Sequence, residues 1–527
     1  MTSILPVSTH TPLTTTPVTT TPIVSVNGVA SLANSPASVV MLGQDSRIAG
    51  AATYSPGGAM ASTEPVFTWE TKLKDKVTQV MQGNLGLASN AARFQGLGAA
   101  LLQQLAEGGA TSISQSVFKT AAGSVLDAAA VKSEHNQLHN GAENTLTLTL
   151  KTASGATITL NLNNDGDGFA IKAEVSGGEL SDMERKALGD MADSFQGAID
   201  GLTAQPPRLE LGSLTKLDPN LFSSVDLSAR LKVGKDQYQT LAFRADDTTR
   251  SVDMSGPSGN VQLSVNNNSA ILGTAQQQAQ AIQTYLTQFD AAQSRGGGDK
   301  NLMALFKDAF SSLQGGTQSL GGAQAKADWS NVNDIDRGML SGLADFSASL
   351  NQNSAYINPM RPGEIDKFAY RTAQTTDAKG SESGNRSLQQ DQTSSLAASY
   401  HKSLYPGTGL ALSTDSKTQN YTYHLIEDEA RSTTRVGYAN GALVQASSTQ
   451  SASQSTTVLK YEMGKLVDTL NTPRQTSKSR DLLGMLDEAL KKDRQARLNS
   501  VPSTLNKDLL GISAKTLLQS NPNALYG

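Results

Sequence analysis

The most regular alternation of hydrophobic and polar residues lies between residues 146 and 175. Apolar side chains take every second position in three runs, at 146–150, 157–162 and 169–175. A period of two is typical of strands with one buried face, and Ser154 and Gly155 between the first two runs are typical of a hairpin turn. The pattern therefore predicts three antiparallel strands.

A helix is predicted after these strands. Ser181 suits an N-cap, and Glu184 follows at the spacing of a capping box, in which each side chain satisfies a free backbone amide. An apolar stripe then runs through Leu180, Met183, Leu188, Met191, Phe195, Ile199 and Leu202. Phe195 is therefore predicted to be buried, whereas Gln196, one position further on, is predicted to face solvent.

Similar patterns extend over the rest of the chain. Helical spacing of apolar residues predicts helices within 66–105, 113–132, 275–289, 302–313, 339–350, 482–490 and 505–518. Alternation predicts strands within 208–265 and 421–461, the latter with a type I′ hairpin at Asn440-Gly441. Residues 373–395 are polar and nearly free of apolar anchors, which predicts a long loop.

These elements predict an α+β fold with two antiparallel β regions, packed amphipathic helices and a disordered N-terminal tail. The predicted parts are a Thr/Pro/Ser-rich tail at 1–62, a helical segment at 66–140, a β-hairpin/helix/β domain at 141–270, a helical hairpin and linker at 271–360, a second β region at 361–470 and C-terminal helices at 471–527. In the tail, proline recurs after threonine and removes backbone donors, so we expect an extended, solvated segment. Whether the two β regions form one domain or two stays open.

Composition narrows the classes of protein. Of the 527 residues, 38% are hydrophobic and only 5% aromatic, which suits several small cores better than one large, dense enzyme core. The net charge of −4 provides no basic field for nucleic acid. The absence of cysteine excludes disulfides, thiolate metal sites and cysteine nucleophiles, but it suits either redox compartment.

No targeting segment is predicted. No Lys or Arg precedes Arg47, and the first residues lack a continuous apolar run, so we do not expect a secretory signal peptide. No stretch approaches the ~18 apolar residues of a membrane span. The predicted location is therefore either the cytoplasm or the cell exterior, reached without a standard leader.

The sharpest candidate for chemistry is a calcium-loop pattern. Its oxygen-bearing positions 1, 3, 5 and 12 are Asn163, Asp165, Asp167 and Glu174, and Gly168 takes position 6. The pattern is incomplete, because the first position is Asn and the ninth is Ile171. A polar turn between strands explains the same composition. A strand from 169 to 175 would also carry Glu174 about 20 Å from Gly168, so we favour the turn and keep calcium binding as the alternative.

Other motifs are incomplete as well. His135 and His139 are four residues apart, as a helical metal pair requires, but Asn136 stands where a catalytic glutamate would be. Histidines are also favoured at a helix C-terminus. Gly96 and Gly98 resemble the start of a dinucleotide fingerprint, but the third glycine is missing and the surrounding pattern is helical. No nucleophile–base pair can be assembled, so no catalytic or cofactor-binding residue is predicted.

One stretch resembles a known family. The run of alternating Leu and Thr at 146–150, the second hairpin strand at 157–162 and the segment Gly178-Glu-Leu-Ser-Asp-Met-Glu-Arg185 are similar to a poorly characterised bacterial family. Its members carry an LTLTL hairpin followed by a GEL[ST]xxER helix, and the resemblance is strongest over 140–230. Some members are labelled lactate dehydrogenase, but no cofactor fingerprint or catalytic Arg/His set can be placed in this chain. The resemblance implies a bacterial origin and no known activity.

The function expected from these observations is a non-enzymatic one. Low aromatic content, absent cysteine and abundant Ser, Thr, Gln and Asn favour an exported or surface-associated structural or interaction protein, with an unidentified protein or surface as its partner. The alternative is a calcium-responsive binding module that uses the loop at 163–174. A third hypothesis is an enzyme without a recognisable motif.

Overall fold

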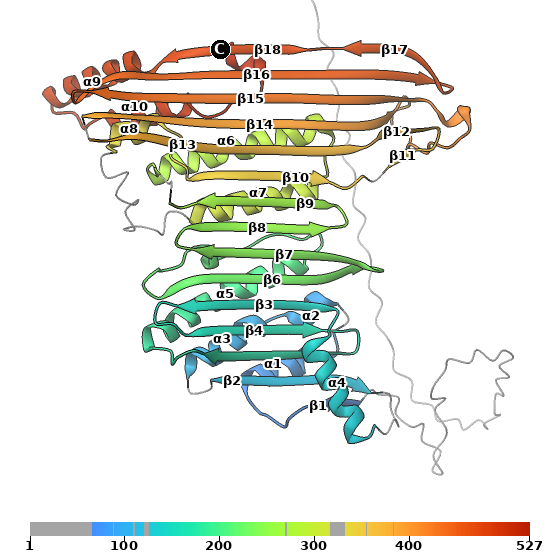
Figure 1. The fold of residues 1–527 in the computed structure, drawn as a ribbon. Coiled ribbons are helices and arrows are strands. Elements are labelled where there is room, and N and C mark those ends of the chain that lie inside the picture. The colour runs from blue at the N-terminus through green and yellow to red at the C-terminus, as the bar shows by residue number, and fades with distance from the viewer. Residues whose placement is uncertain are drawn as a thin grey trace, which may run out of the picture. The chain divides into compact units, whose positions relative to one another are not determined.

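The computed structural model describes residues 66–87, 89–108, 111–120, 126–268, 271–316, 332–354, 356–382 and 384–526. The predicted tail at 1–62 lies outside these residues. Sixteen described strands form one antiparallel sheet, in the order β1-β2-β5-β4-β3-β6-β7-β8-β9-β10-β13-β14-β15-β16-β17, and β18 also pairs with β16 (Figure 1).

The strands lengthen toward the C-terminal half of the sheet. Its strands are β1 (Val66–Trp69), β2 (Ser112–Thr120), β3 (Asn144–Thr152), β4 (Thr157–Asn164), β5 (Gly168–Ser176), β6 (Phe222–Gly234), β7 (Gln237–Asp246), β8 (Thr249–Gly256), β9 (Gly259–Asn266), β10 (Asp345–Gln352), β13 (Lys367–Glu382), β14 (Asn385–Ser403), β15 (Tyr421–Ala439), β16 (Ala442–Glu462), β17 (Lys465–Asn471) and β18 (Arg474–Asp481). A separate two-stranded ribbon contains β11 (Ile357–Asn358) and β12 (Arg361–Ile365).

Helices cover one face of this sheet. They are α1 (Lys76–Asn84), α2 (Asn90–Phe94), α3 (Leu97–Glu107), α5 (Asp182–Thr203), α6 (Ala275–Gly296), α7 (Lys300–Gly315), α8 (Asp334–Met339), α9 (Leu482–Leu498) and α10 (Leu505–Ala514). Helix α4 (Ala128–Asn140) lies on the opposite face (Figure 1). Its Leu138 packs there with Phe118 and Ala170. Apart from α4, the helices that the structure describes leave that face uncovered, and we call it the open face.

The predicted alternation determines which side chains meet the helices. Leu146, Leu148 and Leu150 of β3 are fully buried, while the threonines between them point to the open face. Helix α5 has the predicted capping box at Ser181 and Glu184, and Phe195 is fully buried against the sheet. Local patterns therefore predicted the strand faces, the capping box and the burial of Phe195 correctly, but Met183 of the predicted apolar stripe is exposed.

Three predicted elements were wrong. Residues 113–132 contain β2 and the start of α4 instead of one helix, and residues 339–350 end α8 and form most of β10. The predicted loop at 373–395 belongs to β13 and β14. Because β10 pairs with both β9 and β13, the two predicted β regions form a single sheet. The predicted helical segment at 66–140 likewise contributes two strands.

Buried glutamines explain why β13 and β14 lack hydrophobic alternation. Gln374 and Gln392 have polar side chains, yet they point to the helix-covered face and are almost completely buried. The Gln392 amide donates to the Thr516 carbonyl at 3.1 Å and accepts from the Leu518 amide at 2.8 Å. Backbone groups from the C-terminal segment thus satisfy polar side chains at positions where a strand usually carries apolar ones. The burial of Gln392 thus depends on a segment more than a hundred residues away in the sequence.

No described helix has both the length and the apolar surface that crossing a membrane requires.

Candidate functional site

The open face carries polar side chains in rows that cross the strands. The strand register from β8 to β18 aligns one row of Ser251, Ser264, Ser347, Ala373, Thr393, Arg431, Ser451 and Ser477. The neighbouring row contains Asp253, Gln262, Ser349, Arg371, Ser395, Glu429, Ser453 and Gln475. We call these the serine row and the charged row.

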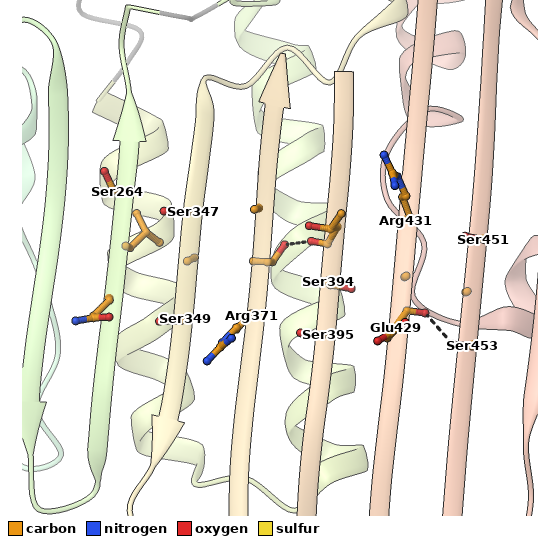
Figure 2. A pocket seen from close by; sticks show the side chains of 18 of the residues that line it. Ser264, Ser347, Ser349, Arg371, Ser394, Ser395, Glu429, Arg431, Ser451 and Ser453 are labelled. Atoms are coloured by element: carbon orange, nitrogen blue, oxygen red, sulfur yellow. Dashed lines mark hydrogen bonds between the residues drawn. The ribbon is translucent and has the colours of Figure 1, made fainter. Parts of the chain in front are cut away.

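A hollow of about 910 Å³ lies over these two rows. All their members except Ser477 line it (Figure 2). Most of these side chains are no longer than Ser or Thr, so they leave space above the strands. Alternate residues of the same strands point to the helix-covered face and anchor the floor in the core. The hollow therefore has a polar lining, and helices packed on the opposite face of the sheet support its floor.

Two charged residues in the hollow lack partners. Among the described residues, neither Arg371 nor Glu429 takes part in an ion pair or a side-chain hydrogen bond, and both are exposed. They lie on β13 and β15, and Ser395 stands between them on β14 (Figure 2). At the usual strand spacing their Cα atoms are about 10 Å apart. A guanidinium and a carboxylate are therefore both available to a ligand.

Arg431, in contrast, is held in place. Its guanidinium donates to Asp391 at 2.8 Å, and the Thr433 hydroxyl donates to the same carboxylate at 2.6 Å. Burial alone would raise the pKa of Asp391, but hydrogen bonds from Thr433, Gln389 and Arg431 hold that pKa below its usual value. Asp391 thus remains ionised and neutralises Arg431 at the edge of the hollow.

A polar cluster lies at one end of the long strands. The β11–β12 ribbon covers the open face there, and His401 Nδ1 is 2.6 Å from Asp366 Oδ1 while its Nε2 is 3.2 Å from Glu364 Oε2. The Tyr421 hydroxyl donates to Glu364 at 2.5 Å. Burial, followed by the contact with Glu364, raises the pKa of Tyr421 above its usual value. The His401 side chain has no exposed surface, so the cluster fastens the ribbon to the sheet.

A second cluster fastens α4. Ser116 Oγ is 2.7 Å from His135 Nδ1 and 2.9 Å from Glu70 Oε2, and His139 Nε2 contacts the same Glu70 oxygen at 2.9 Å. Burial lowers the pKa of His135. The Ser–His contact has the form of a nucleophile–base pair, but Ser116 is fully buried. Ser116 and Glu70 could not be recognised from the sequence, because the apolar spacing around residue 116 predicts a helix where the structure has β2.

The predicted calcium-loop residues lie at the end of β4, in the hairpin turn after it and along β5. The Asn163 amide donates to the His139 carbonyl at 2.7 Å, and the Asp165 carboxylate accepts from the Glu143 amide at 2.5 Å. Asp167 is exposed in the turn, whereas Glu174 lies along β5 and pairs with Lys172 at 2.7 Å.

The turn between β4 and β5 also meets a cation from the protein itself. The Arg93 guanidinium donates to the backbone carbonyls of Asp165 and Gly166. The part of the chain that the structure describes contains no group of three or more His, Asp or Glu side chains arranged to hold a metal. Calcium binding by Asn163, Asp165, Asp167 and Glu174 stays the untested alternative to a polar turn.

The glycines of the sequence motif at 96–98 have packing roles. Gly96 has a left-handed φ of 72° as it begins α3. A Cβ atom on Gly98 would lie 2.5 Å from Ile199 and 3.0 Å from Phe195, so this glycine lets α3 approach α5 closely. Helix packing therefore explains both residues without a nucleotide.

Comparison with known proteins adds no assignment. The chain matches no protein-family profile, no curated protein and no solved structure. Only the geometry of the open face and of the two buried clusters therefore bears on function.

Proposed function

We propose that the chain is a non-enzymatic interaction protein, exported or surface-associated, whose partner binds the open face of the sheet. The observation that carries this proposal is the hollow of about 910 Å³ over the serine and charged rows. Helices bury the apolar face, so the open face is the broad polar surface left for a partner. Its short side chains allow a ligand to approach the backbone closely.

The arrangement of ionisable groups favours binding over catalysis. A nucleophile and its base must lie within hydrogen-bond reach of each other and of a substrate. Arg371 and Glu429 are about two strand spacings apart, roughly 10 Å, which is too far for such a pair. Ser116 and His401 do have close partners, but their side chains are fully buried. These two clusters suit structural roles.

A capture experiment tests whether the open face is the binding surface. The full chain is immobilised and exposed to lysate, envelope and culture medium of the producing cells. Material retained by the wild type should be lost with Ser395→Lys, which places a long cation on the floor of the hollow. Ser228→Lys is the matched control, because Ser228 is an exposed serine of β6 on the same face but outside the hollow.

Two results would count against this proposal. Equal capture by wild type and Ser395→Lys would place the partner elsewhere on the molecule. Loss of capture with both lysine variants would indicate a general charge effect rather than a site in the hollow. Circular dichroism of each variant verifies that the fold is retained.

A further inference from the structure

The side chains within each row of the hollow are spaced at an interval that suits a particular class of polymer. Adjacent strands are about 4.8 Å apart, so each row offers one side chain at that interval. This interval is close to the length of one sugar residue in an extended β-linked glycan. Within a strand, the rows are two residues apart, or about 6.6 Å, which is near the width of a sugar ring.

We propose that the hollow binds an uncharged, extended polysaccharide that lies across the strands between the serine row and the charged row. Each strand then meets about one sugar residue. This inference rests on the proposed function and names the ligand class of the same surface.

Hydrogen-bonding chemistry supports this class of ligand. Serine and threonine hydroxyls both donate and accept, as sugar hydroxyls do. The unpartnered Arg371 contributes a fork of donors, and the unpartnered Glu429 contributes two acceptor oxygens. Ser395 between them is short enough to let a sugar ring approach both groups. Neutral hydroxyls, which donate and accept, can satisfy both charged side chains at once.

The charge balance of the hollow favours a neutral polymer. Arg371 and Arg431 are the cations among its lining residues, but Asp391 already neutralises Arg431, so Asp253 and Glu429 more than offset Arg371. An anionic polysaccharide would require an excess of cations, and the two rows do not have one. None of the described residues that line the hollow is aromatic, so the affinity must come from many hydrogen bonds instead of stacking. Affinity should therefore increase with the length of the glycan.

Titration calorimetry of the full chain tests the proposal. The probes are cellohexaose, cellobiose, chitin oligosaccharides and alginate oligosaccharides. We expect at least one neutral β-linked hexasaccharide to bind at least tenfold more tightly than its disaccharide. Arg371→Ala and Glu429→Ala should each weaken binding at least tenfold, and Ser395→Lys should abolish it. Ser395→Thr keeps the hydroxyl and should retain binding, as should Ser228→Lys.

Three results would overturn the proposal. These are tighter binding of alginate than of the neutral glycans, binding that Ser395→Lys leaves unchanged, and the absence of binding to every neutral probe. If capture from cell fractions still depends on Ser395 while the glycans fail, the ligand class is wrong and the proposed function stands. If both experiments fail, the open face is a solvated surface and both proposals are wrong.

Discussion

Glu184 connects the start of α5 to the hairpin before it. Its carboxylate accepts from the Ser181 amide at 2.7 Å and from the Ser154 hydroxyl at 2.7 Å. Burial alone would raise its pKa, but the hydrogen bonds from Ser181, Ser154 and Thr152 lower the pKa to about 2. The folded pKa thus lies below the unfolded value of about 4.3. The stabilisation is complete above the unfolded value and is lost as pH falls toward 2.

The first prediction follows from this carboxylate. Glu184→Gln should lower the free energy of unfolding by about 2 kcal/mol at pH 7, because a charged acceptor is lost from a buried capping box. The difference from wild type should shrink between pH 4 and pH 2. Urea unfolding at pH 7 and pH 3 measures both values. Glu179→Gln, at an exposed position, is the control, and an equal difference at the two pH values would contradict the explanation.

The pair Phe195 and Gln196 gives the second prediction, and one part of the sequence interpretation needs revision. Phe195→Ala should lower the free energy of unfolding by about 3–5 kcal/mol, because the side chain is fully buried. Gln196 was expected to face solvent, but its side chain accepts from the Gly98 amide at 2.9 Å and donates to the Phe94 carbonyl at 3.2 Å.

Gln196 therefore supplies a cap for α3, whose own N-cap residue Gly96 has no side chain to do so. Gln196→Ala should cost about 1 kcal/mol, the usual effect of losing a helix cap. Chemical denaturation of the full chain measures both variants. A loss at Gln196 below a few tenths of a kcal/mol would show that the cap adds nothing.

At the scale of elements, the β11–β12 ribbon gives the third prediction. His401→Ala would leave Glu364 and Asp366 without their shared partner in a buried cluster. Removing one partner from such a buried cluster lowers stability by about 3–5 kcal/mol. Most of this loss should appear as easier local opening of the ribbon. Hydrogen exchange over Ile357–Ile365 should accelerate, while exchange in β3 and β4 stays as in the wild type. Tyr405→Ala, at an exposed side chain nearby, should leave the ribbon protected.

The turn between β4 and β5 gives the fourth prediction. A calcium site would require Glu174 to leave β5 and its pair with Lys172 and return to the turn. We expect titration with millimolar calcium to show no binding that Asp165→Ala and Asp167→Ala abolish. Binding tighter than millimolar that disappears in both variants would show that the turn rearranges around the ion. The calcium-responsive module would then become the leading function.

For the whole molecule, the pairing of β9 with β10 gives the fifth prediction. A chain that ends at Asn268 exposes the β9 edge and removes α7, which packs on that strand. Open strand edges with apolar neighbours promote association, so this fragment should aggregate. A chain that begins at Ser62 keeps every described strand and should keep the same state of association as the wild type. Light scattering after gel filtration measures the molar mass of both truncated chains. A monomeric fragment ending at Asn268 would mean that β1–β9 fold alone.

Local sequence by itself determined β3 to β9, helices α5 to α7 and the capping box, because the residues that reveal them lie within a few positions of one another. It also indicated a protein rich in polar surface without obvious catalytic motifs. Only the tertiary structure decided that β10 joins the two β regions, since that strand gains its identity from neighbours on both sides.

The same holds for the polar groups. Gln392 is buried because the backbone at 516–518 reaches it, and His401 is buried because β12 and the residue after it bring Glu364 and Asp366 to it. The rows of the open face exist only once eight strands are in register. Periodicity records whether a side chain is apolar, but it contains no information about a partner that lies tens of residues away.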